Sequence, residues 1–536
     1  MNSTRTMSFG FPMSEAERRR SLEWRRAGPL LIAAAIGLVY VLVSPPSGDL
    51  AAHMFRTRLF SEDPFGIWNN YWYSGHHIIG YSLLFPAASA ALTPQIAASL
   101  AVIGTAAAFE QLAHRSFGAD AWLGTSLFAA AIASELFAGR LAFAFGAFPA
   151  MASVLALDRE RTGIAAALAL LSALCSPVAA LFAAVAGCAH LLGARRPGGA
   201  VVVIAALLPI AATALLFPEG GSEPFAFSAM WPIPVLAVGA LIALGPEATV
   251  LRAGVVIYAL ATIASYAIAT PVGSNAARLG TLLAAPLAAL LFWPRRARWL
   301  ALCVLPLLYL EWQAPARDLA TASGQPSVST GYYQPLLSFL ERQPGASGRE
   351  FRVEVPFTRF HWEAYVVASR FPLARGWERQ LDTRDNALFY DGRLTPASYD
   401  AWLHRTAVRF VAVPDAPLDY SAKAETRLID RGLPYLRLVL RTAHWRVYEV
   451  RHAAEIAQGA ARLQALGPDW VKLYAPRAGT TFLRVHFTPY WALVRGSGCV
   501  APAGDLTRVT VRRAGEVELA VRFALDRVRA NSARCS

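Results

Sequence analysis

The chain has 536 residues, of which 55% are hydrophobic and only 16% charged. About a quarter of the residues of a soluble protein are charged, so this composition excludes an ordinary soluble enzyme and predicts an integral membrane protein. The net charge of +14 comes almost wholly from arginine, since Lys423 and Lys472 are the only lysines. We assign much of it to the flanks of membrane spans and predict no nucleic-acid partner.

The N-terminal segment, residues 1–27, is polar and precedes the first apolar run. No small-residue cleavage site follows that run, which predicts a retained anchor. Basic residues beside a first span favour the cytoplasmic side, so we expect a cytoplasmic N-terminus and a first span at about 28–45 that runs outward. The basic residues are Arg18, Arg19, Arg20, Arg25 and Arg26.

The predicted transmembrane domain covers residues 28–313 and contains a long first outer loop at 46–77. The stretch 78–113 fits two short spans broken at Pro94, or one re-entrant piece plus one span. The positive-inside rule favours one crossing, and a second crossing there could be balanced by reading 163–192 as one helix. The sequence therefore predicts a polytopic α-helical membrane protein with about eleven spans. The further spans lie near 120–138, 140–157, 163–192 (two halves split at Pro177), 199–217, 229–245, 249–269, 276–293 and 297–313.

An acidic residue and a histidine stand four apart where the chain leaves the first span. In a helix, Asp49 and His53 would point to the same face. Two interpretations are open: Asp49 caps a short surface helix, as Asp commonly does, or the pair belongs to a catalytic site.

The later part of the first outer loop is aromatic. The cluster Trp68–Tyr73 is typical of a segment at the lipid headgroups. His76 and His77 follow, and then Tyr81. The two histidines fit a polar pair at a helix start or ligands of a divalent metal. Because a metal site needs more ligands than this stretch offers, we assign no metal residues and no certain cofactor.

Ionisable residues at membrane depth are costly and usually functional. The predicted topology gathers Asp49, His53, Glu135, Arg140 and Arg278 at the outer membrane surface. Arg278 follows Asn275 at the outer end of its span, and an arginine at a helix N-terminus suits a phosphate. The alternative for Arg140 and Arg278 is that they snorkel to the headgroups.

The polar C-terminal part begins after a Ser-, Thr-, Gly- and Ala-rich linker at 314–332. Residues 333–536 predict an extracytoplasmic mixed α/β domain that ends in a small antiparallel β-sandwich. In an oxidising compartment, Cys499 and Cys535 would form a disulfide. The segment 375–382 fits either a contact with a sugar or polymer acceptor, or a loop packed on the membrane half. We expect strands near 351–355, 408–413, 445–450, 480–487, 506–511 and 517–523, and helices near 334–342, 396–406 and 452–465.

The layout resembles the GT-C class of integral membrane glycosyltransferases over about residues 28–310. The matching features are Gly48-Asp49 after the first span, the aromatic cluster Trp68–Tyr73, and Gly80-Tyr81 leading to Pro86. The chain departs from some members because Leu50 follows Asp49 where they carry a second acid. It also lacks an oligosaccharyltransferase acceptor motif in its C-terminal part, which leaves acceptor and metal dependence unassigned.

The resemblance implies transfer of a sugar from a polyprenyl-phosphate donor to a glycan or lipid acceptor of the cell envelope, with inversion. Asp49 would be the general base, His53 would orient it or bind the phosphate, and Arg140 and Arg278 would stabilise charge on the departing phosphate. Alanine- and arginine-rich usage favours a bacterial source, hence the plasma membrane. The further substrate-binding candidates are His76, His77, Tyr81, Glu135 and Asn275.

Two rival functions fit a polytopic chain. One is a transporter or lipid flippase, but the sequence lacks the internal repeat common in transporter folds, and its long first loop and C-terminal part are asymmetric. The other is a non-catalytic cell-envelope assembly protein. It predicts that Asp49→Ala is silent in cells while deletion of 333–536 is not.

Overall fold

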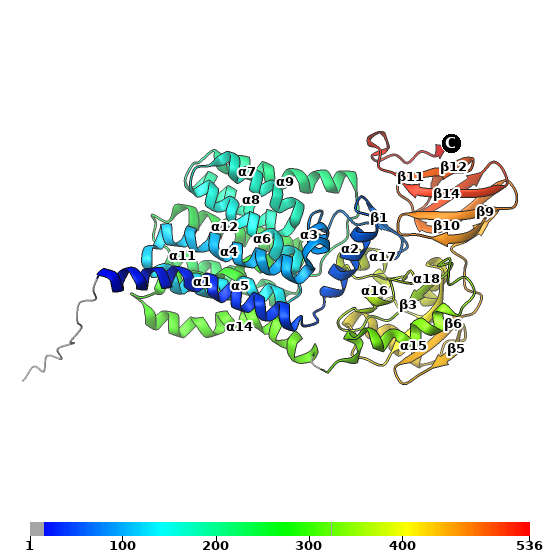
Figure 1. Ribbon diagram of the computed structural model, residues 1–536, viewed down its shortest axis with the longest axis horizontal. Coiled ribbons are helices and arrows are strands. Elements are labelled where there is room, and N and C mark those ends of the chain that lie inside the picture. Colours follow the sequence, from blue (N-terminus) through cyan, green and yellow to red (C-terminus); the bar gives the residue numbers. More distant parts are fainter. Residues whose placement is uncertain (1–14, 323, 536) are drawn as a thin grey trace, which may run out of the picture.

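The computed structural model describes residues 15–322 and 324–535. The protein is mostly helical, at 56%. A bundle of apolar helices forms one half of the molecule, and two β-containing C-terminal units form the other (Figure 1). The protein is therefore a membrane protein with a β-rich C-terminal region. Of the predicted polar segment 1–27, residues 1–14 lie outside the described part.

Seven helical stretches in the described residues are long and apolar enough to cross a membrane. One of them, Pro94–Phe137, has 44 residues and folds back at the short helix η1 (Gly118–Ala121). The rings of Phe109 and Phe128 stack with centroids 3.9 Å apart, whereas a straight helix would separate them by about 28 Å. The bundle helices are α1 (Glu15–Val43), α4 (Pro94–Phe117), α5 (Trp122–Phe137), α6 (Leu141–Asp158), α7 (Thr162–Cys175), α8 (Pro177–Gly193), α9 (Gly198–Leu216), α10 (Phe227–Met230), α11 (Pro232–Ala243), α12 (Thr249–Ala267), α13 (Arg278–Phe292) and α14 (Ala297–Ala322).

The two stretches with open alternatives each contain a break. In 78–113, helix α3 (Phe85–Leu92) has eight residues, about 12 Å, which is too short to cross a hydrocarbon core of about 30 Å. Thr93, at φ +79°, separates it from α4. In 163–192, Ser176 is extended and divides α7 from α8. Helix α14 continues to Ala322, into the stretch predicted as a linker, because its alanines favour helix.

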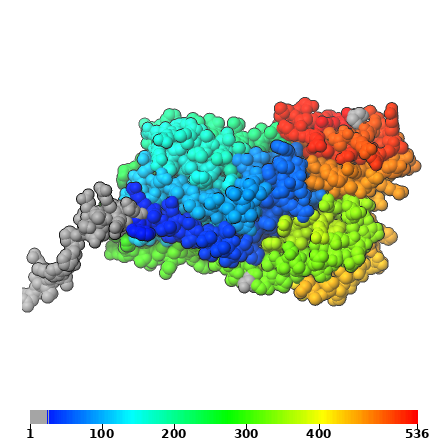
Figure 2. All heavy atoms as spheres, viewed as in Figure 1, coloured from blue at the N-terminus to red at the C-terminus, as the bar shows by residue number. Residues whose placement is uncertain are grey.

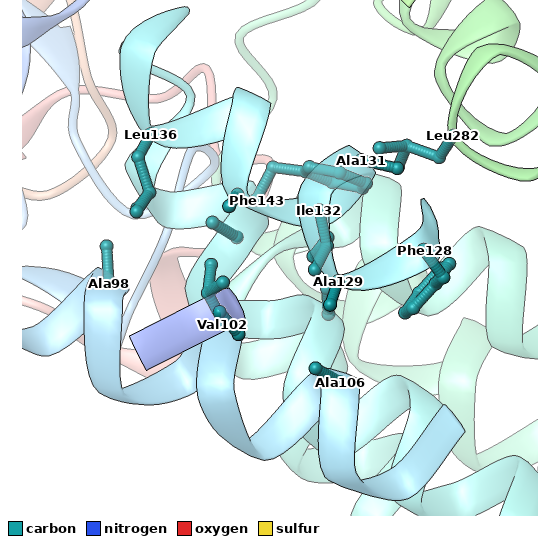
Figure 3. Packing of buried hydrophobic residues seen from close by; sticks show 14 of the residues in the cluster. Ala98, Val102, Ala106, Phe128, Ala129, Ala131, Ile132, Leu136, Phe143 and Leu282 are labelled. Atoms are coloured by element: carbon teal, nitrogen blue, oxygen red, sulfur yellow. The ribbon is translucent and has the colours of Figure 1, made fainter. Parts of the chain in front are cut away.

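Small side chains let the bundle helices approach closely. Ala98, Val102 and Ala106 of α4 face Ala129 and Ile132 of α5 in the buried cluster shown in Figure 3. Methyl-sized contacts such as these give dense packing between helices inside a bilayer, where the hydrophobic effect cannot bring helices together.

Basic side chains gather at the end of the bundle away from the C-terminal units. Arg26 lies 2.7 Å from His114, Arg115 donates to Asp158 at 2.7 Å, and Arg159 donates to Gln111 at 2.8 Å. The opposite end of the bundle meets the C-terminal units (Figure 1).

The first C-terminal unit is built on a four-stranded mixed sheet of order β3-β4-β6-β5, in which only β3 and β4 are parallel. Helices and turns cover it and carry the loop that returns to the bundle. Its elements are α15 (Thr330–Glu341), β3 (Arg352–Glu354), α16 (Glu363–Val366), α17 (Arg379–Asp385), α18 (Pro396–Arg405), β4 (Val408–Pro414), α19 (Lys423–Asp430), β5 (Leu436–Arg441) and β6 (Trp445–Val450).

The second C-terminal unit is an antiparallel β-sandwich. One sheet has the order β15-β12-β13-β10-β7 and the other β11-β14-β9-β8, and side chains of both form one core. A disulfide between Cys499 and Cys535 joins β12 to β15. The strands are β7 (Ala457–Gly459), β8 (Arg462–Leu466), β9 (Trp470–Ala475), β10 (Gly479–His486), β11 (Trp491–Arg495), β12 (Gly498–Ala503), β13 (Leu506–Val511), β14 (Gly515–Val521) and β15 (Arg534–Cys535).

The helix predicted near 452–465 is wrong. This stretch forms β7 and β8, which pair with β10 and β9. Its Ala-, Leu- and Gln-rich composition favours a helix. Strand pairing overrides that preference, and Gly459 at φ +134° adopts a backbone conformation that a helix excludes.

The first outer loop packs against both the bundle and the C-terminal units. It comprises α2 (Leu50–Glu62) and the hairpin β1 (Trp68–Asn69) and β2 (His76–His77). Trp68 belongs to the sandwich core, and Trp72, fully buried, belongs to the core of the mixed-sheet unit. The rings of Trp68–Tyr73 therefore contact protein partners that a local sequence pattern cannot reveal, and the headgroup depth of this segment stays a prediction.

We expect the stability of the mixed-sheet unit to fall as pH rises, because of Glu363. Burial raises the pKa of this carboxyl from 4.5 to about 7, although Thr358 donates to it. The folded state holds a proton that the unfolded state releases above its lower pKa. The stabilisation is therefore complete below about pH 4.5 and is lost as pH rises through about 7, a change of about 3 kcal/mol.

Glu363→Gln tests this dependence. Thermal unfolding of the full chain in detergent should show a smaller decrease in unfolding temperature between pH 5 and pH 8 for the variant than for the wild type. Equal decreases would contradict the assignment to Glu363.

Candidate functional site

Asp49 lies at the start of α2, where the bundle meets the C-terminal units. Its side chain makes no capping hydrogen bond. Its Oδ1 instead accepts a hydrogen bond of 3.0 Å from the Trp377 indole of the mixed-sheet unit. The half-buried carboxylate is therefore fixed from outside the bundle, and capping does not explain its orientation.

His53 lies one turn further along α2 and is 2% exposed. Its ring is 5.8 Å from Tyr81 and 5.1 Å from Phe85 between centroids, and its Nε2 has no hydrogen-bond partner in the described part of the chain. Burial lowers its pKa to about 4, although Asp49 opposes the shift. The imidazole is therefore neutral at pH 7.

Gly139, in the turn between α5 and α6, lets that turn approach α2. It has φ +72°, and a Cβ atom there would lie 2.1 Å from Ser47 Oγ. The Gly139 backbone also interacts with the His53 ring. A glycine at this position thus brings the neighbouring Arg140 toward the start of α2.

Arg140 and Arg278 join Asp49 from distant parts of the chain. Arg140 Nη1 donates to Glu135 Oε1 at 3.2 Å. Arg278, the first residue of α13, lies with its guanidinium carbon 5.2 Å from the Phe143 ring centroid. Each arginine interacts electrostatically with Asp49. Glu135 Oε2 and Arg278 Nε are buried and lack hydrogen-bond partners among the described residues.

The two loop histidines do not join this cluster directly. His76 Nε2 is 3.1 Å from Asn69 Nδ2, and His77 contacts Glu219 at 2.7 Å and Thr488 at 3.1 Å. His77 therefore joins the β1–β2 hairpin to the sandwich and to a loop of the bundle half, whereas His76 bonds within the hairpin. Asn275 is buried in the turn η2 (Gly273–Ala277), where its N–H donates to Val272, three residues before Arg278.

Arg56 and Glu311 are two further ionisable residues of the cluster formed by Asp49, His53, Glu135, Arg140 and Arg278, and neither was singled out from the sequence. Arg56 is buried beside Tyr81, with its guanidinium carbon 4.0 Å from the ring centroid, and it pairs with Glu378. Glu311 of α14 is 7% exposed and interacts with Glu135. Glu311 could have been found, because an acidic residue inside the apolar run 297–313 is unusual. Arg56 could not, because its partner Glu378 lies far away in the sequence.

The segment that contains Trp377 and Glu378 packs on the membrane half, as the second interpretation of 375–382 predicts. Gln380 Nε2 donates to Pro271 O at 3.3 Å, and Thr383 donates to Ser222 O at 2.7 Å. The cluster is thus covered by the mixed-sheet unit.

The described residues contain no group of three or more His, Cys, Asp or Glu side chains that could hold a metal ion. The cluster combines the carboxyl groups of Asp49, Glu135, Glu311 and Glu378 with the guanidinium groups of Arg56, Arg140 and Arg278 and the imidazole of His53. Guanidinium groups that keep N–H donors without partners among the described residues can bind an anion. Comparison with known protein families and with curated proteins finds no match.

Proposed function

We propose that the protein is a GT-C-like membrane glycosyltransferase that moves a sugar from a polyprenyl-phosphate donor to a cell-envelope glycan or lipid acceptor, with membrane lipids around the bundle. In this proposal the chain crosses the bacterial plasma membrane eleven times, by α1, α4 to α9, the stretch of α10 and α11 (Phe227–Ala243), and α12 to α14. The basic residues at the far end of the bundle support a cytoplasmic N-terminus. The C-terminal units then lie outside the cytoplasm, where the Cys499–Cys535 disulfide is stable.

One observation carries the proposal: Asp49, held by Trp377, interacts electrostatically with both Arg140 and Arg278, which interact more strongly with Glu135. A carboxylate is one of the side chains that serve as a general base. It can act as a base while the arginines receive an anion. If Asp49 only capped a surface helix, nothing would require a buried Arg278 Nε without a hydrogen-bond partner among the described residues.

The reaction balances with these groups. Asp49 takes the proton of an acceptor hydroxyl while the hydroxyl oxygen bonds to the anomeric carbon. The bond from that carbon to the donor phosphate oxygen breaks, and its electron pair leaves on the phosphate. Arg140 and Arg278 stabilise this negative charge, and attack opposite the leaving group inverts the centre. Neutral His53 orients Asp49 or donates to the phosphate.

The direct test uses the purified full chain in liposomes that contain polyprenyl-phosphate-linked hexoses or pentoses. We expect release of polyprenyl phosphate that depends on an added acceptor. Movement of the intact lipid between leaflets without bond cleavage would instead favour a flippase. No turnover or movement of any donor, with full cellular function of Asp49→Ala, would favour the assembly protein.

Arg278→Gln is expected to weaken binding of polyprenyl phosphate about 10- to 100-fold, because a hydrogen bond to a charged group contributes about 1.5–3 kcal/mol. Titration of the lipid into nanodisc-embedded protein measures this loss. Arg159→Gln is the matched control, since Arg159 is exposed at the other end of the bundle. Equal affinities of the two variants would remove Arg278 from the site.

A further inference from the structure

Two adjacent residues of the mixed-sheet unit close over one face of α2. Trp377 donates to Asp49, and Glu378 forms an ion pair with Arg56. Asp49 and Arg56 are seven positions apart, about two helical turns, so they lie on the same face. Trp377 and Glu378 therefore engage the Asp49 carboxylate and the Arg56 guanidinium at the same time.

Arg56 has the environment of an anion-binding arginine. Its side chain is 5% exposed, and its guanidinium lies between the rings of Tyr81, at 4.0 Å, and Trp72, at 5.6 Å. Its Nε is buried without a hydrogen-bond partner in the described structure. It interacts with His53, as Arg278 does, so Arg56 belongs to the same cluster. A buried guanidinium requires an anion, and Glu378 supplies one.

Hydrogen bonds fix the backbone beneath Glu378, and its side chain alone reaches Arg56. Tyr73 Oη donates to Gly376 O at 2.6 Å and accepts from the Glu378 N–H at 2.9 Å. A Cβ atom on Gly376 would lie 2.2 Å from Trp72, so the two segments pack closely. The Glu378 side chain is 17% exposed, and burial raises the pKa of its carboxyl although Arg56 opposes the shift. A change in the side-chain torsions of Glu378 alone would free Arg56, because Glu378 contacts this arginine through its side chain.

We propose that Arg56 is a phosphate-binding residue for the polyprenyl-phosphate donor and that Glu378 is its internal competitor, which leaves Arg56 when the phosphate binds. The inference rests on the proposed function. Phosphate and carboxylate compete for the same guanidinium. Trp377 stays on Asp49 as a positioning residue, so the base remains oriented while the anion is exchanged.

The test measures binding of undecaprenyl phosphate to the full chain in nanodiscs, with undecaprenol as the probe without phosphate. Glu378→Gln should bind the phosphate lipid about tenfold more tightly than wild type, a gain of about 1.4 kcal/mol. Arg56→Gln should bind it at least about tenfold more weakly. The double variant should match Arg56→Gln, and undecaprenol should bind all variants equally. Glu62→Gln is the matched control, since it removes the exposed Arg58–Glu62 pair of the same helix.

Unchanged or weaker phosphate binding by Glu378→Gln would overturn the inference, and so would a gain that persists in the double variant. Glu378→Ala, which removes the carboxylate altogether, provides a second variant and should also bind more tightly. Displacement of the lipid by millimolar inorganic phosphate alone would mean a free-phosphate site and would also overturn it. If Asp49→Asn abolishes transfer while Glu378→Gln leaves phosphate binding unchanged, the inference fails and the proposed function stands. If the wild type does not bind the phosphate lipid, both fail.

Discussion

Asp49→Asn is expected to lower sugar transfer about 10²- to 10⁴-fold, which is the contribution of a positioned general base. Asparagine keeps the oxygen that accepts the hydrogen bond from Trp377, so the local structure should remain while the proton acceptor is lost. The measurement is the turnover of the purified full chain with a polyprenyl-phosphate sugar. The unfolding temperature should stay close to that of the wild type.

Asp63→Asn is the matched control for Asp49→Asn. Asp63 lies at the other end of α2, and its carboxylate accepts a hydrogen bond from the Phe65 N–H. The same isosteric change there should leave turnover within about twofold, as expected for a surface position. Full activity of Asp49→Asn would remove Asp49 from the role of base.

Arg375→Leu is expected to destabilise the mixed-sheet unit by about 3–5 kcal/mol, because it leaves buried acids without their cation. The Arg375 side chain is 0% exposed. It donates to both oxygens of Asp382, at 3.0 and 2.6 Å, and lies 3.5 Å from Glu425. The rings of Phe357 and Phe389 cover its two faces at 3.9 and 4.1 Å.

The loss should appear as a lower unfolding temperature of the full chain in detergent and as faster proteolysis between residues 340 and 450. Arg409→Leu is the matched control: Arg409 is 28% exposed and lies 3.4 Å from Glu449, so its loss should cost less than about 1 kcal/mol. Equal destabilisation by the two variants would show that the buried ion pairs of Arg375 stabilise the unit no more than the exposed pair of Arg409 does.

The sequence predicts the bundle well because hydropathy is a local property. The breaks at Thr93 and Ser176 lie beside the prolines that suggested them. The predicted strands at 408–413 and 445–450 appear as β4 and β6, since their β-branched and aromatic residues favour strands. The prediction of a helix at 452–465 is wrong because the structure of this stretch depends on pairing with β9 and β10, and not on its local composition.

The candidate site was only partly predictable for the same reason. Asp49 and His53 could be found because they follow the first span, and Arg140 and Arg278 because charge is rare beside apolar runs. The role of Arg56 depends on Glu378, which is 322 positions away. A local sequence pattern cannot predict a contact between residues so far apart. For the same reason, the protein partners of the aromatic cluster Trp68–Tyr73 could not be predicted.

Burial of the first outer loop has a consequence for biosynthesis. Asn70 bonds to the backbone of Trp470, 400 positions later, and space-filling atoms of this loop border both C-terminal units (Figure 2). At about 5–20 residues per second, the ribosome needs about 20–80 s to reach that partner. Throughout this interval Trp68 and Trp72 lack the cores that enclose them in the finished protein, which makes the unfinished chain a client for chaperones.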